Sequence, residues 1–263
     1  MKPFRTRPGP APTDAVSLAR TLSKLGYCSR SQAEKLVREG RVAVDGRIVR
    51  HPDLRVDPRR ARLQVDGAPV SAARRVYLML NKPRGLVTTA SDPEGRQTVY
   101  SCLGGLDLPH LAPVGRLDMA SEGLLLMSND TRWAQRILDP ASGVEKTYHV
   151  QIDRVPDPPF MARLRQGAVD DGEALSLKSA ALLREGDRNA WLEMVIDEGR
   201  NRQIRRIVEA TGAQVLRLVR VRIGGLVLGP LPKGALRELD PEETALPLLG
   251  GASPANAAAR RAG

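Results

Sequence analysis

The first part of the chain changes from helical to alternating spacing of its apolar residues. Ser17 stands in an N-cap position before three leucines spaced three to four residues apart, and Gly26 marks the end of this first helix. Ser31 followed by Glu34 has the spacing of a capping box for a second helix that ends at Gly40. Two helices are therefore expected before any hairpin.

Short apolar runs follow, separated by the residues of tight turns. Asp45-Gly46 lies between "RVAV" and "RIV", and Asp66-Gly67 follows "RLQV". An Asp-Gly pair between apolar-rich runs is the strongest short-range hairpin signal. The pattern predicts a small two-helix-plus-hairpin domain over residues 16–73, which the linker "SAARR" joins to a second domain over residues 75–249.

The second domain is predicted to contain more strands than helices. Helices are expected from Asp130 through "TRWAQRIL", over residues 158–166, from Asn201 to Gly212, and after Asp240. Strands are expected in the leucine run after Gly123 and at "VYLML", "LVTT", "EKTYHVQI", "ALSLKSAALL", "AWLEMVI" and "QVLRLVRVRI". Because the strands come in runs, we predict an α+β fold built on a mixed, largely antiparallel sheet.

Charge and composition narrow the function classes. The 263 residues carry a formal net charge of +11 and the pI is about 10.3, which favours a polyanionic partner. No apolar run approaches the roughly 20 residues of a spanning helix. The two cysteines and three histidines lack metal-ligand spacing, and no glycine-rich phosphate loop occurs. We expect a cytoplasmic nucleic-acid-binding protein without metal or cofactor, with disordered ends at residues 1–15 and 250–263.

Basic residues are concentrated in two regions. Residues 16–70 contain twelve Lys and Arg against six Asp and Glu, and Lys35, Arg38 and Arg41 cluster at the second helix and its exit. Residues 200–222 contain seven arginines and one acid. In the helix of this second region, Arg202 and Arg206 point away from the apolar stripe, whereas Arg205 falls at its edge and is placed to reach along the sheet. Any one of these residues could simply belong to a solvated face, but together they indicate RNA contacts.

Three residues are candidates for chemistry: Asp118, Tyr148 and Arg205. Asp118 lies between Gly115 and Gly123, whose backbone freedom suits a site loop on a rigid sheet, although an aspartate here could also just cap a turn. Glu122 could pair with Asp118 as the two carboxylates of a glycosidase. Tyr148 lies in a predicted strand, where its ring could serve either the core or a single bound base.

Several segments together resemble a known family. "GRLD" with "SEGLLLMSND", "EKTYHV", "EGRNRQIRRI" and "RIGGLVLGPLPKGALREL" are similar, in order and spacing, to the signature segments of bacterial ribosomal RNA pseudouridine synthases that modify a single uridine. "MLNKPRG" matches the strand and turn that open their catalytic domain, and residues 16–70 resemble the S-four-like RNA-binding domain that precedes it. The resemblance spans nearly the whole chain from Val16 to about Leu249.

The resemblance implies roles for individual residues. Asp118 matches the essential aspartate that attacks or deprotonates the ribose, Tyr148 the tyrosine that packs on the uracil, and Arg205 the basic residue that pairs with the aspartate. Arg116 matches a residue that enters the RNA stack where the uridine leaves it. Lys82, in "MLNKPRG", is expected to join the RNA contacts. The isomerisation has no net redox or hydrolytic step and needs no cofactor.

The target and the partners are less closely defined. "DPEGRQTV" and "SEGLLLMSND" are similar to large-subunit enzymes, whereas "LNKP", "EKTY" and "RIGG" are similar to the small-subunit enzyme. We expect large-subunit rRNA as the substrate of a monomer that does not bind a membrane. The same chemistry on small-subunit rRNA, or a non-catalytic rRNA-binding assembly factor, are the alternatives.

Overall fold

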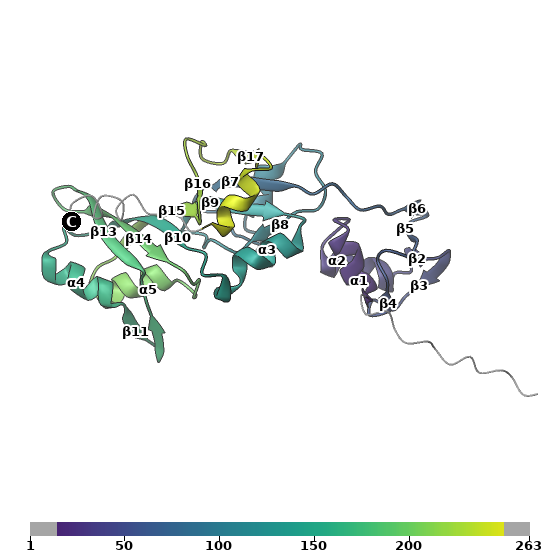
Figure 1. Ribbon diagram of the computed structural model, residues 1–263, viewed down its shortest axis with the longest axis horizontal. Coiled ribbons are helices and arrows are strands. Elements are labelled where there is room, and N and C mark those ends of the chain that lie inside the picture. Colours follow the sequence, from purple (N-terminus) through teal and green to yellow (C-terminus); the bar gives the residue numbers. More distant parts are fainter. Residues whose placement is uncertain (1–14, 250–263) are drawn as a thin grey trace, which may run out of the picture. The chain divides into compact units, whose positions relative to one another are not determined.

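The computed structural model describes residues 15–249, which form two compact units (Figure 1). Unit 1 ends at Val76 but also includes Asp107–Ala112, and unit 2 comprises Tyr77–Leu106 and the residues from Pro113 onward. The segment Asp107–Ala112 therefore groups with unit 1, although in sequence it lies inside the predicted second domain.

The predicted disordered ends lie outside the described residues, apart from Ala15, which is buried. Within residues 15–249, no helix has the length and apolar character needed to cross a membrane.

Unit 1 packs two helices against a small antiparallel sheet. Its elements are β1 (Val16–Ser17), α1 (Leu18–Lys24), α2 (Arg30–Arg38), β2 (Val42–Val44), β3 (Arg47–Val49), β4 (Arg55–Val56), β5 (Leu63–Val65) and β6 (Ala68–Pro69). The strand order is β3-β2-β5-β6, and β1 pairs with β4. Leu18, Leu22 and Val37 from the helices pack against Val42 and Leu63 from the sheet to form its core.

The hairpin turns of unit 1 form as predicted, whereas the helix cap differs. Asp45 and Asp66 both adopt positive φ, as do their glycines, which is the geometry of tight hairpin turns. The cap of α2 is Ser29 and not Ser31: the Ser29 hydroxyl accepts from Gln32 N at 3.2 Å, and the Gln32 side chain accepts from Ser29 N at 3.0 Å. The prediction was wrong by two residues because Ser29, and not Ser31, has the extended backbone of an N-cap, and its hydroxyl and the Gln32 side chain satisfy the free N–H groups.

Unit 2 is built on one large sheet. Its elements are β7 (Tyr77–Lys82), η1 (Val99–Leu103), β8 (Ala112–Val114), β9 (Glu122–Ser128), α3 (Thr131–Leu138), η2 (Pro140–Ser142), β10 (Lys146–Ile152), α4 (Pro158–Gln166), β11 (Ala168–Asp170), β12 (Glu173–Leu175), β13 (Ser179–Glu185), β14 (Ala190–Ile196), α5 (Gln203–Ala210), β15 (Val215–Ile223), β16 (Leu226–Val227), β17 (Leu236–Glu238) and η3 (Glu243–Leu248).

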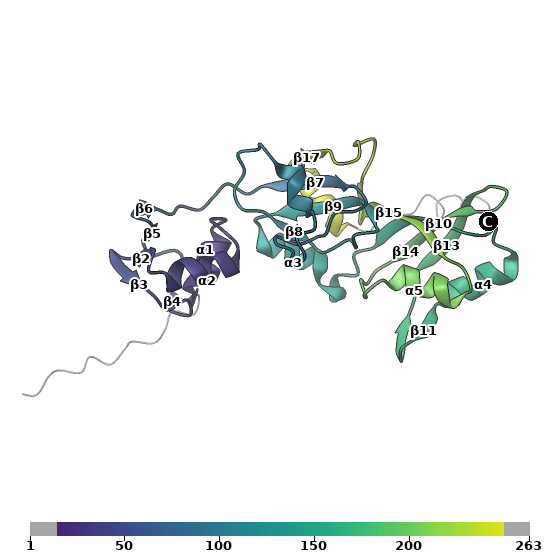
Figure 2. The same ribbon diagram turned by 180° about the vertical axis from the view of Figure 1, so that it is seen from behind.

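The sheet follows the order β13-β14-β10-β15-β9-β7-β17, with β16 beside β15 and β8 beside β9. Along this path neighbouring strands are antiparallel except β15 and β9, which run parallel. In both views α4 and α5 lie together on one side of the β13-β14-β10 part, and the β11-β12 hairpin projects beyond α5 (Figures 1 and 2). The predicted α+β class with a mixed, largely antiparallel sheet is confirmed.

Two local predictions for unit 2 were wrong. The segment "LVTT" forms no strand, only an isolated bridge between Val87 and Thr98, because the backbone turns at Thr88, where Thr89 N donates to Val87 O at 3.1 Å. Helix α5 begins at Gln203 after Arg202, whose φ of 50° is left-handed, so Asn201 does not cap it. The helix is instead entered through a sharp loop.

Candidate active site

Asp118 lies in the loop between β8 and β9, where the two parts of the sheet meet at the parallel β15-β9 pair. Gly115 and Gly123 flank this loop with φ values of 78° and 102°, which only glycine adopts without strain. The Thr88 hydroxyl donates to the Leu117 carbonyl at 2.7 Å and accepts from Leu117 N at 3.3 Å. The loop is thus held through its backbone, which leaves the Asp118 side chain exposed.

Lys82 supports the same loop from beneath and is not an RNA contact. Its side chain is fully buried, and its Nζ donates to the carbonyls of Pro83 (3.1 Å), Asp118 (3.1 Å) and Ser121 (2.8 Å). Burial lowers the pKa of Lys82 to about 8, although Asp118 favours the charged form. The prediction of a direct RNA contact was wrong because the ammonium group points into the loop backbone.

We predict that Lys82→Met lowers the free energy of unfolding by about 2 kcal/mol, because buried carbonyls lose their donor, and reduces activity about tenfold by loosening the Asp118 loop. Between pH about 8 and pH 10.5, which is the ordinary pKa of lysine, Lys82 is deprotonated in the folded protein and protonated in the unfolded chain. The stability of the wild type relative to the variant should therefore rise across that interval. Urea unfolding at several pH values measures this, and a difference that falls with pH contradicts it.

Asp118 and Tyr148 line one pocket of about 280 Å³. The basic side chains around it come from Arg116, Lys146, Arg200, Arg202 and Arg220. Arg116 and Arg202 were expected near the site from the sequence, whereas the other three were not singled out. Lys146 could not be recognised from the sequence, because it occupies one of several polar positions in a predicted strand. Arg200 and Arg220 could not be recognised because their region contains many other arginines.

An irregularity in β15 explains how Arg220 reaches this pocket. Tyr148 of β10 pairs with Arg220, but Thr147 pairs with Arg222, so one extra residue of β15 is accommodated between them. A bulge of this kind shifts the alternation of side chains by one position. Arg220 and Ile223 can therefore both line the pocket despite their odd spacing.

Arg205 lies beside the Asp118 loop without touching its carboxylate. The side chain is buried, with Nη2 donating to Ala120 O at 3.2 Å and Nη1 donating to Val215 O at 3.3 Å. Burial lowers the pKa of Arg205, and the Asp118 charge acts in the opposite direction. No ion pair within 4 Å joins these two residues in the described part of the chain, so their pairing stays a prediction.

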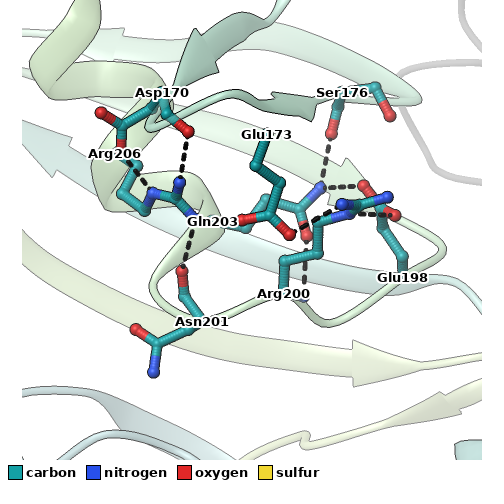
Figure 3. Close-up of polar contacts among 8 residues, drawn as sticks. All are labelled: Asp170, Glu173, Ser176, Glu198, Arg200, Asn201, Gln203 and Arg206. Atoms are coloured by element: carbon teal, nitrogen blue, oxygen red, sulfur yellow. Dashed lines mark hydrogen bonds and ion pairs between the residues drawn. The ribbon is translucent and has the colours of Figure 1, made fainter.

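Arg206 is engaged in an internal network and is not free for RNA (Figure 3). Its guanidinium contacts Asp170 at 2.5 Å and Glu173 at 2.6 Å, and only 17% of its side chain is exposed. Glu173 also binds Arg200 at 2.7 Å. The predicted RNA contact by Arg206 was therefore wrong: sequence periodicity places it outside the apolar stripe, but the β11-β12 hairpin covers that side of α5.

The same network fixes the rim of the pocket. Gln203 donates to Ser176 O at 2.8 Å and to Glu198 at 2.7 Å, and Glu198 also binds Arg200 at 2.9 Å. Arg202 remains exposed, with a contact to Glu209 at 3.7 Å. Arg202 thus keeps a position at the pocket from which it can meet a ligand.

Glu122 does not form a carboxylate pair with Asp118. Its carboxylate is buried and binds Arg217 Nε at 3.0 Å and Lys233 Nζ at 2.5 Å. Burial alone would raise the pKa of Glu122, but hydrogen bonds from these two cations lower it overall. Since Glu122 does not line the pocket, the structure removes the second carboxylate that the glycosidase hypothesis requires.

The basic residues expected to bind RNA in unit 1 lie at its surface. Lys35 is 3.9 Å from Glu39, Arg38 is 3.2 Å from Glu34, and Arg41 forms two hydrogen bonds with Asp66. Exposed pairs of this kind contribute little free energy. All three cations can therefore exchange their partners for phosphates.

Comparisons with known proteins place the chain in a family. The RNA pseudouridylate synthase family matches residues 76–210, and the S4 domain family matches residues 16–59. A protein of Rickettsia bellii named as an uncharacterised RNA pseudouridine synthase is 39% identical, over 84% of this chain and 96% of its own. The large-subunit pseudouridine synthase B of Bacillus subtilis is 33% identical, over 86% and 93%.

A solved structure agrees as well. A crystal structure of a pseudouridylate synthase is 30% identical with a TM-score of 0.61, and the match covers 89% of this chain and 100% of that one. The chain therefore belongs to the RNA pseudouridylate synthase family and carries an N-terminal S4 domain.

Proposed function

We propose that this enzyme isomerises one uridine of large-subunit ribosomal RNA to pseudouridine. The observation that carries the proposal is the single pocket that Asp118 and Tyr148 share. Relatives from Bacillus subtilis and Haemophilus influenzae named as large-subunit pseudouridine synthases support the choice of substrate. We also propose that the enzyme acts as a monomer in the cytoplasm, where bacterial ribosomal RNA is made and assembled.

The size of the pocket fits a single extruded nucleotide. Its volume of about 280 Å³ is just below the roughly 300–1,000 Å³ of drug-sized small-molecule sites. A uridine within paired RNA cannot present its ribose and C5 edge to a side chain, so it has to be flipped out of the stack. We assign Arg116 and Arg202, which are exposed at the pocket, to hold the distorted backbone.

Asp118 is then the catalytic residue that reacts with the ribose. A carboxylate that attacks C1′ or takes the C2′ proton has to be ionised, and the positive charges of Lys82 and Arg205 both interact with Asp118. The N1–C1′ bond breaks, the base rotates, and a C5–C1′ bond forms. Tyr148 lies on the pocket wall, where its ring can pack on the uracil and its hydroxyl can assist removal of the C5 proton.

Mapping of pseudouridines tests this proposal. The rRNA of both subunits should be mapped in cells with and without the gene, and in deleted cells that regain either the wild type or Asp118→Asn. We expect one large-subunit pseudouridine to vanish on deletion and to return only with the wild type. Loss of a small-subunit pseudouridine would reassign the substrate, and an unchanged map would favour a non-catalytic assembly factor.

Glu122 offers a separate check on the chemistry. We expect Glu122→Gln to retain pseudouridine formation within about threefold, because the residue does not reach the pocket, while the lost ion pairs lower stability by about 1–3 kcal/mol. Conversion should be measured well below the melting temperature of the variant. A folded Glu122→Gln protein without activity would restore the two-carboxylate hypothesis.

A further inference from the structure

Arg220 is a buried cation whose hydrogen bonding is incomplete. Only 5% of the residue is exposed, and its Nε donates to Leu124 O at 2.7 Å. Its Nη2 is buried and has no hydrogen-bond partner, and no carboxylate lies within 4 Å of the guanidinium among the described residues. A buried charge without a counter-ion is costly, so a structure that keeps one calls for an explanation.

The position of Arg220 connects this feature to the candidate active site. Arg220 lies directly opposite Tyr148 in the β10-β15 register and lines the same pocket as Asp118. Ser121, which also lines the pocket, has a buried hydroxyl that lacks a partner as well. Two unpaired donors thus converge on the pocket from neighbouring strands and loops.

The chemistry of a guanidinium restricts which ligand groups can accept the unused hydrogen bond of Arg220. Arginine has only donors and stays protonated, so its partner has to be an acceptor, and an anionic acceptor is the strongest. Because the group is shielded from water in the free protein, its attraction for an anion is weakened little by solvent. A donor that is fixed in advance and pays no reorganisation is what stabilises charge that develops during a reaction.

We infer that Arg220 contacts the uracil ring and stabilises the negative charge that the base acquires when the glycosidic bond breaks. This inference rests on the proposed function. Whether an Asp118 oxygen bonds to C1′ or Asp118 removes the C2′ proton, the electron pair of the N1–C1′ bond stays with the base. The charge spreads over N1, O2 and O4, and it is neutralised when C5 bonds to C1′, which releases the Asp118 oxygen from C1′ or is accompanied by return of the C2′ proton. The C5 proton then leaves while N1 takes up a proton, so that the net change is an isomerisation.

The substrate allows the inference to be tested. In vitro transcripts of large- and small-subunit rRNA would be made with uridine or with 5-fluorouridine, and the nucleoside whose C5 is bonded to C1′ would be measured by digestion and mass spectrometry under single-turnover conditions. With 5-fluorouridine this product keeps its fluorine, because C5 has no proton to lose, so the comparison reports glycosidic-bond cleavage and C5–C1′ bond formation. Fluorine withdraws electrons and itself stabilises the departing base. We expect Arg220→Met to slow the reaction of uridine about 100-fold and that of 5-fluorouridine about tenfold or less, with RNA affinity within threefold of the wild type.

Matched variants separate this role from a structural one. Arg220→Lys keeps the buried charge but not the planar guanidinium, so it should fold and react with uridine at a rate between those of the wild type and Arg220→Met. It serves as the test variant if Arg220→Met does not fold. Arg163→Met, at an exposed position of α4 outside the pocket lining, should leave both rates unchanged. If Arg220→Met slows the reactions of uridine and 5-fluorouridine by the same factor, or slows neither, the inference about Arg220 is overturned. A wild-type protein that isomerises no uridine in either the large- or the small-subunit transcript would instead overturn the proposed function.

Discussion

Asp118→Asn should lower the single-turnover rate of pseudouridine formation by at least about 10³-fold. Asparagine keeps the size of the side chain but can neither attack C1′ nor accept a proton at neutral pH. The loop itself should persist, because Thr88, Lys82 and Arg205 hold it through backbone carbonyls and not through the carboxylate. Binding of rRNA should be unchanged or slightly tighter, since one negative charge is removed from a basic site.

Asp171→Asn is the matched control for this experiment. Asp171 lies at the turn of the β11-β12 hairpin with a φ of 49°, which asparagine tolerates, and it does not line the pocket. Its activity should equal that of the wild type. If Asp118→Asn retains more than a tenth of the wild-type rate, Asp118 is not the reagent.

Gly123→Ala should lower the free energy of unfolding by about 3 kcal/mol or more and abolish activity with it. A Cβ at Gly123 would lie 2.2 Å from the backbone oxygen of Arg220, and its φ of 102° is strained for any other residue. The added atom cannot be relieved by a side-chain rotation, because it meets the backbone of β15. Relief requires β9 and β15 to separate at the point where Asp118 and Arg220 are positioned.

Denaturant unfolding of Gly123→Ala and Gly104→Ala provides the measurement. Gly104 has a φ of −53°, and a Cβ there would meet only ordinary contact at 3.6 Å from Ser101 O. Alanine at Gly104 should therefore change stability by less than about 1 kcal/mol. A Gly123→Ala protein with wild-type stability would mean that the β9-β15 junction yields more readily than its backbone contacts indicate.

Local pattern in the sequence was sufficient to predict most elements and to single out Asp118, the residue proposed to react with the ribose. The Asp-Gly hairpins, the cap at Asp130, the helix over residues 158–166 and the buried strand after Gly123 follow from turn chemistry and periodicity, which act between neighbours in the chain. Asp118 could be singled out for the same reason, as an acid between two glycines in a segment that resembles a family signature.

The partners of each charge were decided only by tertiary structure. Lys82 and Arg206 looked like RNA contacts because they are basic, yet one is buried under the Asp118 loop and the other is bound by the β11-β12 hairpin. Arg220 could not be distinguished from the other arginines in the sequence; the bulge in β15 places it opposite Tyr148 and at the pocket. Sequence determines which residues carry charge, but whether a charge is paired, buried or directed at a ligand depends on strands that meet from distant parts of the chain.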